Sequence, residues 1–208
     1  MFALANSLAV ASEYPGPGVF EVVKGESEVR VLVYRGGLLG VFGHNHVIST
    51  TAISGRIEIG EHPATSSVWL TIPVAGLEVD VDELRRQEGE PFSKTVSDKN
   101  KQGTQKNMLG GKLLDSANFS SIDIRSQHWS GELPHILVRS EVTVRGQTNI
   151  LEFPATVSAS DKQIIVTGSF IVTHAQLGLT PFKAILGGLR VRDRMELKFR
   201  ITARRVSD

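Results

Sequence analysis

The feature that most constrains this chain is a strict alternation of apolar and polar residues in several short segments. Within residues 196–205, polar residues occupy positions 196, 198, 200, 202 and 204, and apolar residues occupy 197, 199, 201 and 203. A period of two puts the apolar side chains on one face of a β-strand. The same period predicts strands at residues 30–34, 53–59, 68–74, 122–124, 135–145 and 151–158. Many short alternating strands with tight turns, such as Arg145-Gly146-Gln147, predict an antiparallel sandwich or barrel.

One stretch interrupts this pattern. Between residues 80 and 118 the chain is rich in charge and shows little alternation, and residues 81–87 and 97–109 predict short helices. Ser97 is suited to be an N-cap, and Gly110 with Gly111 ends the second helix. Asp80 and Asp82 open the first helix, where the helix dipole favours negative charge. We therefore expect a helical insertion that packs over one end or flank of the sheet.

Composition excludes several function classes. The 208 residues fit one domain, 40% hydrophobic residues suffice for a core, and a net charge of +1 gives no reason to expect nucleic acid as a partner. Because cysteine is absent, disulfides, thiolate metal sites and cysteine nucleophiles are excluded. No apolar run approaches the ~20 residues that cross a bilayer as a helix. Since no nucleophile motif or phosphate-binding loop is present, we expect no enzymatic activity.

The first residues differ from the rest of the chain. Residues 2–11 are mostly small and apolar, and Ala9-Val10-Ala11 resembles a signal-peptidase cleavage pattern, although the usual basic residues before it are missing. We expect residues 1–17 to be a tail or the remnant of a signal peptide, and residues 18–206 to be the barrel domain. The expected location is periplasmic or exported, with a cytoplasmic location as the alternative.

His44 and His46 are the most conspicuous candidates for chemistry. On a strand they share one face with Phe42 and Ile48, and they lie about 7 Å apart. If His174 joined them from another strand, the three imidazoles could hold a metal or a haem. The simpler interpretation is that one histidine is buried and bonded to backbone while the other lies near a barrel mouth.

Several strands have apolar residues on both faces, notably residues 164–172 and 37–47. A barrel has one interior, and the additional apolar residues either fill it or line a cavity. The pattern alone leaves both alternatives open.

Four segments carry a family resemblance. They are residues 41–44 (VFGH) followed by 53–57 (ISGRI), residues 108–126, the turn VTVRGQT at 142–148, and residues 170–179 followed by 191–197. Read together, and in this order from about residue 18 to 205, they resemble the YceI-like family of lipocalin-like, polyisoprenoid-binding proteins. The turn at 142–148 is the most specific of the four. Ser120, where proline is usual, and His174, where arginine is more common, depart from the family pattern.

The resemblance implies an all-β, lipocalin-like extended antiparallel β-barrel with a short helical insertion and a long apolar tunnel. It implies non-enzymatic binding or transport of a polyisoprenoid, such as an isoprenoid quinone, and no cofactor other than that non-covalently bound lipid. His44 and His46 are then candidates for contact with the head group. The alternative function is a metal- or haem-binding accessory protein that uses His44, His46 and His174. The expected ligand-binding residues are Phe42, His44, His46, Phe119, Ile122, Ile124, Val142, Val144, Phe170, Val172, His174, Leu177, Leu179 and Phe182.

The expected partners follow from the same resemblance. They are an isoprenoid lipid or quinone, a membrane contacted transiently for lipid exchange, and a second copy of the chain if an edge strand or apolar mouth is exposed. No nucleic-acid partner is expected. Residues 178–188 combine glycines with apolar residues, and they form either a gate for lipid entry or a cap over the core.

Overall fold

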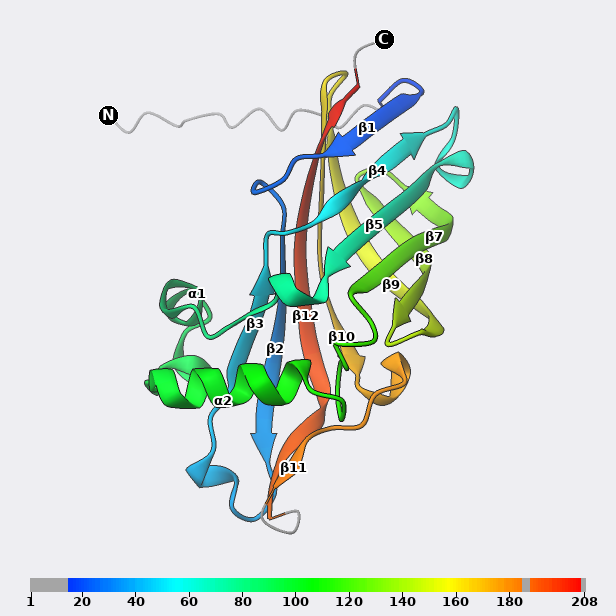
Figure 1. Cartoon of the computed structure of the whole chain (residues 1–208). Helices are drawn as coiled ribbons and strands as arrows, with labels where there is room; N and C mark the ends of the chain where they lie inside the picture. Colours follow the sequence, from blue (N-terminus) through cyan, green and yellow to red (C-terminus); the bar gives the residue numbers. More distant parts are fainter. Residues whose placement is uncertain (1–14, 185–187, 207–208) are drawn as a thin grey trace, which may run out of the picture.

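The chain forms one antiparallel sheet that closes into a barrel (Figure 1). The computed structural model describes residues 15–184 and 188–206. Going round the ring, each strand is hydrogen-bonded to the next, and β12 returns to β1. The ring consists of β1 (Gly18–Val22), β4 (Ser54–Ile59), β5 (Ser67–Pro73), β7 (Ser121–Glu132), β8 (His135–Val144), β9 (Gln147–Ala159), β10 (Gln163–Thr173) and β12 (Leu189–Arg205). The predicted all-β, lipocalin-like barrel is confirmed.

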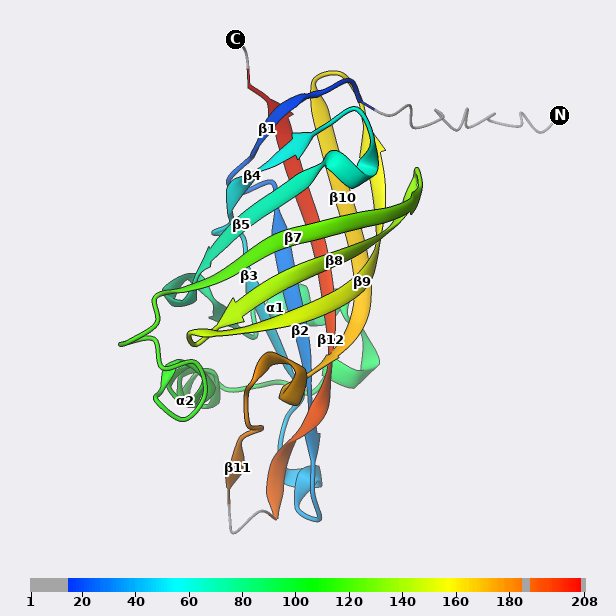
Figure 2. The same cartoon turned by 90° about the vertical axis from the view of Figure 1, so that its right-hand side faces the viewer.

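The last strand, β12, pairs with three neighbours. Along one edge it pairs with β10. Along the other edge, its last residues, 203–205, pair with β1, whereas residues 190–200 pair with β2 (Glu28–Gly36). From β2 the sheet continues to β3 (His46–Thr50) and β6 (Glu78–Val79). The barrel therefore closes at the end that holds β1, and at the other end β2, β3 and β6 form a wing that leaves the ring (Figures 1 and 2).

The helical insertion lies beside this wing, as predicted (Figure 1). Its helices are α1 (Asp82–Gln87) and α2 (Asp98–Leu109), and the Ser97 side chain caps α2 by accepting a hydrogen bond from the N–H of Asn100 at 3.4 Å. None of the helices in the described residues is long and apolar enough to span a membrane. The remaining short elements are the 3-10 helices η1 (Gly40–Phe42), η2 (Pro63–Thr65), η3 (Val74–Gly76), η4 (Glu90–Phe92) and η5 (Ala175–Leu177), and the two-residue strand β11 (Lys183–Ala184).

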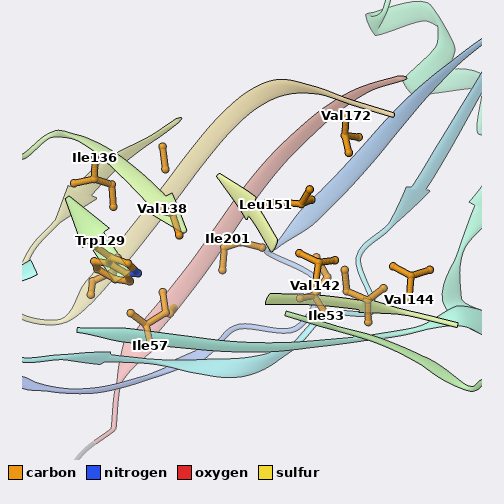
Figure 3. Packing of buried hydrophobic residues seen from close by; sticks show 14 of the residues in the cluster. Ile53, Ile57, Trp129, Ile136, Val138, Val142, Val144, Leu151, Val172 and Ile201 are labelled. Atoms are coloured by element: carbon orange, nitrogen blue, oxygen red, sulfur yellow. The ribbon is translucent and has the colours of Figure 1, made fainter. Parts of the chain in front are cut away.

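Large side chains fill the closed end of the barrel. Ile57, Trp129, Ile136, Val138 and Ile201 are all buried, and they come from strands on opposite sides of the ring (Figure 3). They are the inward-facing residues of the alternating segments, because successive side chains of a strand point to opposite faces. The hydrophobic core therefore fills this end and continues to the other end, where Met108, Val144 and Met195 also belong to it. The predicted apolar faces are the faces that meet inside.

The predicted strand through residues 42–48 is wrong for residues 42–45, whereas residues 46–48 do lie on β3. The chain leaves β2 at Gly37, whose φ of +88° favours glycine, and then forms η1 before β3 begins at His46. At Gly43 the Leu189 side chain approaches so closely that a Cβ would lie 2.8 Å from it, and this proximity fits the turn against the start of β12.

Other predictions about local structure had different outcomes. The turn at Arg145-Gly146 joins β8 to β9 with positive φ at both residues, as a two-residue hairpin requires. The strand predicted at 122–124 extends over all of β7. Of the predicted tail, residues 1–14 lie outside the described residues, and so do residues 185–187 of the predicted gate or cap.

Barrel closure through β1 yields a stability prediction. Phe20 is fully buried, its register partners are Ile57 of β4 and Arg205 of β12, and the Arg205 guanidinium lies 4.5 Å from the ring centroid. We expect Phe20→Ala to lower the free energy of unfolding by about 3–5 kcal/mol, because it leaves a cavity where the ring closes. Val19→Ala, next to it on the outer face, should change this free energy by less than about 1 kcal/mol. Urea denaturation of both variants measures the difference, and equal effects would contradict this account of closure.

Candidate ligand-binding cavity

The open end of the barrel contains a cavity of about 610 Å³. Its walls come from β2, β3, the first half of β12, α2 and the segment around η5. Most of the wall is aliphatic, with Val31 and Val33 on one side and Met195 and Leu177 on others. Phe42, which is 75% exposed, and Arg190, which is also exposed, belong to the wall, and the cavity therefore reaches the surface there.

The cavity lies beside residues 189–195 of β12, in the part of this strand that pairs with β2 and not with β1. There a helix, α2, covers the interior in place of another strand. Residues 99, 100, 103, 104, 107 and 108 of α2 line the cavity, a spacing that corresponds to one face of a helix. Gly103 lies on this face and has no neighbouring atom within 4 Å of the position a Cβ would take. Small residues here leave space that larger residues would fill.

A buried ionic network stands behind one wall. The Asp80 carboxylate is fully buried, and its Oδ2 lies 2.6 Å from Nδ1 of His46. Its Oδ1 accepts hydrogen bonds from the Val47 N–H at 2.9 Å and from Arg85 Nη1 at 2.5 Å. Arg85, also buried, neutralises the carboxylate and fixes the surrounding loops, because it also donates to three backbone carbonyl oxygens at 2.7–2.8 Å. The network is thereby satisfied internally.

The network determines how His46 faces the cavity. Burial alone would raise the pKa of the Asp80 carboxyl, but the hydrogen bond and charge of His46, the Val47 N–H and the charge of Arg85 together hold that pKa below its usual value. An ionised carboxylate only accepts hydrogen bonds, so the proton of this contact resides on Nδ1 of His46. The Nε2 atom has no hydrogen-bond partner among the described residues, and His46 is part of the cavity wall.

Two further histidines belong to the wall. His44 lies next to His46, with 6.2 Å between ring centroids, and partial burial together with the positive charge of Lys94 lowers its pKa. His174 is almost fully buried, and its Nδ1 donates to the Asp193 carbonyl oxygen at 2.9 Å. In the described part of the chain, no three histidine or acidic side chains are placed to hold a metal ion. The metal- or haem-binding alternative is therefore not favoured.

The predicted binding residues divide into two groups. Five lie elsewhere: Val142 and Val172 are buried in the core, Ile124 and Phe170 pack against it, and the ring of Phe119 lies over the turn at Gly146. The other nine line the cavity, and they are Phe42, His44, His46, Ile122, Val144, His174, Leu177, Leu179 and Phe182.

Sequence reasoning missed the side of the site formed by α2 and by the ionic network. The sequence predicts that Asp80 opens the first helix, but it lies outside α1 and has a φ of +57°. Its carboxylate contacts His46 and Arg85, which are 34 and 5 positions away. Positive φ is uncommon for a residue other than glycine, although aspartate adopts it more often than most. Its position just before a helix gave no signal of a contact with His46.

Comparisons with known proteins agree with this architecture. The model of the YceI-like domain family matches residues 20–203. Among solved structures, the chain is similar to BcnA of Burkholderia cenocepacia, with a TM-score of 0.64 and 14% identity over 87% of this chain and 98% of that chain. It is also similar to the YCEI protein of Campylobacter jejuni, with a TM-score of 0.53 and 10% identity over 74% of this chain and 82% of that chain. At these identities the likeness to the two structures concerns the fold alone. Among curated proteins, none matches the chain significantly in sequence.

The buried network yields a prediction about stability and pH. Asp80→Asn removes the charge that compensates buried Arg85, and we expect it to lower the free energy of unfolding by about 3–5 kcal/mol at neutral pH. The pKa of Asp80 is lower in the folded state than in the unfolded chain, where it is about 3.9. The stabilisation is therefore fully present above that value and is lost as the pH falls through the folded-state pKa. Denaturation at pH 7 and near pH 3 measures the difference in the free energy of unfolding between wild type and Asp80→Asn, and we expect this difference to be smaller near pH 3. A difference that stays constant with pH would contradict the assignment.

Proposed function

The chain belongs to the YceI-like family, whose barrels generally bind lipids or polyisoprenoids, and we propose that it binds the apolar chain of an isoprenoid lipid without catalysing a reaction. The observation that carries this proposal is the cavity of about 610 Å³ with largely aliphatic walls. Its volume lies within the range of about 300–1,000 Å³ that is common for small-molecule sites. Burial stabilises a bound prenyl chain by about 0.8 kcal/mol for each CH₂ group, without specific polar contacts.

His46 is the proposed contact for the head group. Because the Asp80 carboxylate accepts a hydrogen bond from Nδ1–H of His46, the neutral form of His46 carries its lone pair on Nε2, and in that form Nε2 accepts a hydrogen bond from a ligand hydroxyl. An isoprenoid alcohol satisfies this atom, and so does a lipid of the quinone type in its reduced form, which carries hydroxyl groups. A ligand with only carbonyl or ether oxygens offers no donor for it.

The apolar wall gives the first test. Leu177 lines the cavity, whereas the adjacent Gln176 is exposed. We expect Leu177→Glu to weaken the binding of geranylgeraniol at least ~10-fold. The bound prenyl chain would cover the carboxylate introduced at position 177 and remove it from water, which is costly. Gln176→Glu adds the same charge in the same turn and keeps the oxygen that accepts from the Thr173 N–H, so it should leave affinity nearly unchanged. Titration calorimetry gives both affinities. If Leu177→Glu bound as tightly as the control, the ligand would lie elsewhere.

The head-group contact is tested by pairing two ligands with two proteins. Wild type should prefer geranylgeraniol over its methyl ether by roughly 2- to 10-fold at about pH 8, since only the alcohol donates a hydrogen bond. In His46→Leu this preference should disappear. Unchanged affinity of the variant for the methyl ether shows that the cavity is intact. A preference that persisted in the variant would rule out His46 as the contact.

A further inference from the structure

The end of the molecule farthest from β1 presents three apolar side chains to solvent. They belong to residues 37–43, which follow β2 and are called the tip loop below (Figures 1 and 2). Leu38 is 96% exposed, Val41 67% and Phe42 75%, whereas the other exposed large hydrophobic residues of the described chain are 36–44% exposed. Single exposed apolar residues are common on protein surfaces, but three within five positions form a patch that usually has a binding partner.

The backbone of the tip loop is ordered by its own hydrogen bonds. The N–H groups of Gly40, Phe42 and Gly43 donate to carbonyl oxygens three residues earlier, at 3.0–3.1 Å. The N–H of Leu39 donates to the Gly188 carbonyl at 2.8 Å, which ties the loop to the start of β12. These donors therefore need no water as a partner. Each N–H group that is satisfied in this way lowers the cost of moving the loop from water into an apolar medium.

The surroundings of the tip loop are basic. At this end of the molecule the described residues 35–43, 182–184 and 188–192 contain Arg35, Lys183, Arg190 and Arg192 but no acidic residue. Arg35 donates to two carbonyl oxygens of the tip loop, at 3.2 and 2.7 Å. The other three are exposed and have no ion-pair partner within the described residues. The patch is thus apolar at its tip and positively charged at its base.

We propose that the tip loop docks the protein on a bilayer that contains anionic lipids. In this arrangement Leu38, Val41 and Phe42 enter the interfacial region, and the flanking cations contact the negatively charged head groups. Phe42 is part of both the exposed patch and the cavity wall. Docking therefore brings the end where the cavity reaches the surface against the membrane, and a lipid can pass between bilayer and cavity without crossing water.

Vesicle flotation of the full chain tests the proposal. Wild type should float with phosphatidylcholine vesicles that contain roughly 30% phosphatidylglycerol. The amount of protein that floats should be at least ~10-fold lower with vesicles of phosphatidylcholine alone, or when about 0.5 M NaCl is present. The double variant Leu38→Asp and Val41→Asp should bind at least ~10-fold more weakly. Neither residue lines the cavity, so the affinity of this double variant for geranylgeraniol should stay unchanged. Because these vesicles contain no isoprenoid lipid, this result is independent of whether the proposed cargo is correct.

Two matched variants complete the experiment. Ile150→Asp with Ile171→Asp introduces the same charges at residues of β9 and β10 that are 43% and 44% exposed, and it should float like wild type. Lys183→Gln with Arg192→Gln should lose most of the dependence on phosphatidylglycerol. The proposal is overturned if wild type does not bind the anionic vesicles, or if the Ile150 and Ile171 variant loses as much binding as the tip-loop variant. It is also overturned if sedimentation shows a dimer that the tip-loop variant dissociates, because the patch would then be covered by a second copy.

Discussion

The pairing of β12 is the constraint on which the rest of the structure depends. This strand keeps β10 along one edge and divides the other edge between β1 and β2. Apolar residues alternate with polar ones from Met195 to Ala203, whereas nearer its start Asp193 interrupts the alternation where the register with β2 shifts, and the surroundings of its inner face change along its length. Ile201 and Ala203 belong to the packed core and do not line the cavity, whereas Val191 lines the cavity that α2 covers, and Met195 belongs to both the core and the cavity wall. One strand thus builds a core at one end and a binding cavity at the other.

The cavity combines this apolar wall with a small polar region of defined chemistry. Asp80 is buried and ionised, Arg85 neutralises it, and the bond to His46 orients one imidazole on the wall. A buried charge pair is weak evidence for added stability, but losing one partner is strongly destabilising. The pair therefore holds His46 in one orientation without leaving an uncompensated charge near an apolar ligand. The basic and apolar tip loop lies at the same end, where the cavity reaches the surface.

Local patterns predicted much of the fold and less of the site. Alternation identified the strands, and the cap at Ser97 identified α2, because both depend on residues close in sequence. The division of β12 between two partners depends on pairings with strands far away in sequence, and alternation is the same with either partner. The strand predicted through His44 failed because Gly37, Gly40 and Gly43, which all precede His44, permit a turn. The contact between Asp80 and His46 spans 34 residues, and a pattern around either residue cannot reveal it.

The most direct test of the central claim is native mass spectrometry of the purified chain before and after extraction with organic solvent, with the extract analysed for lipids. The account predicts one isoprenoid lipid per chain, with a hydroxyl-bearing head group, that is released on extraction and rebinds when it is added back. A chain that carries no lipid and takes up neither isoprenoid alcohols nor reduced quinones would contradict it.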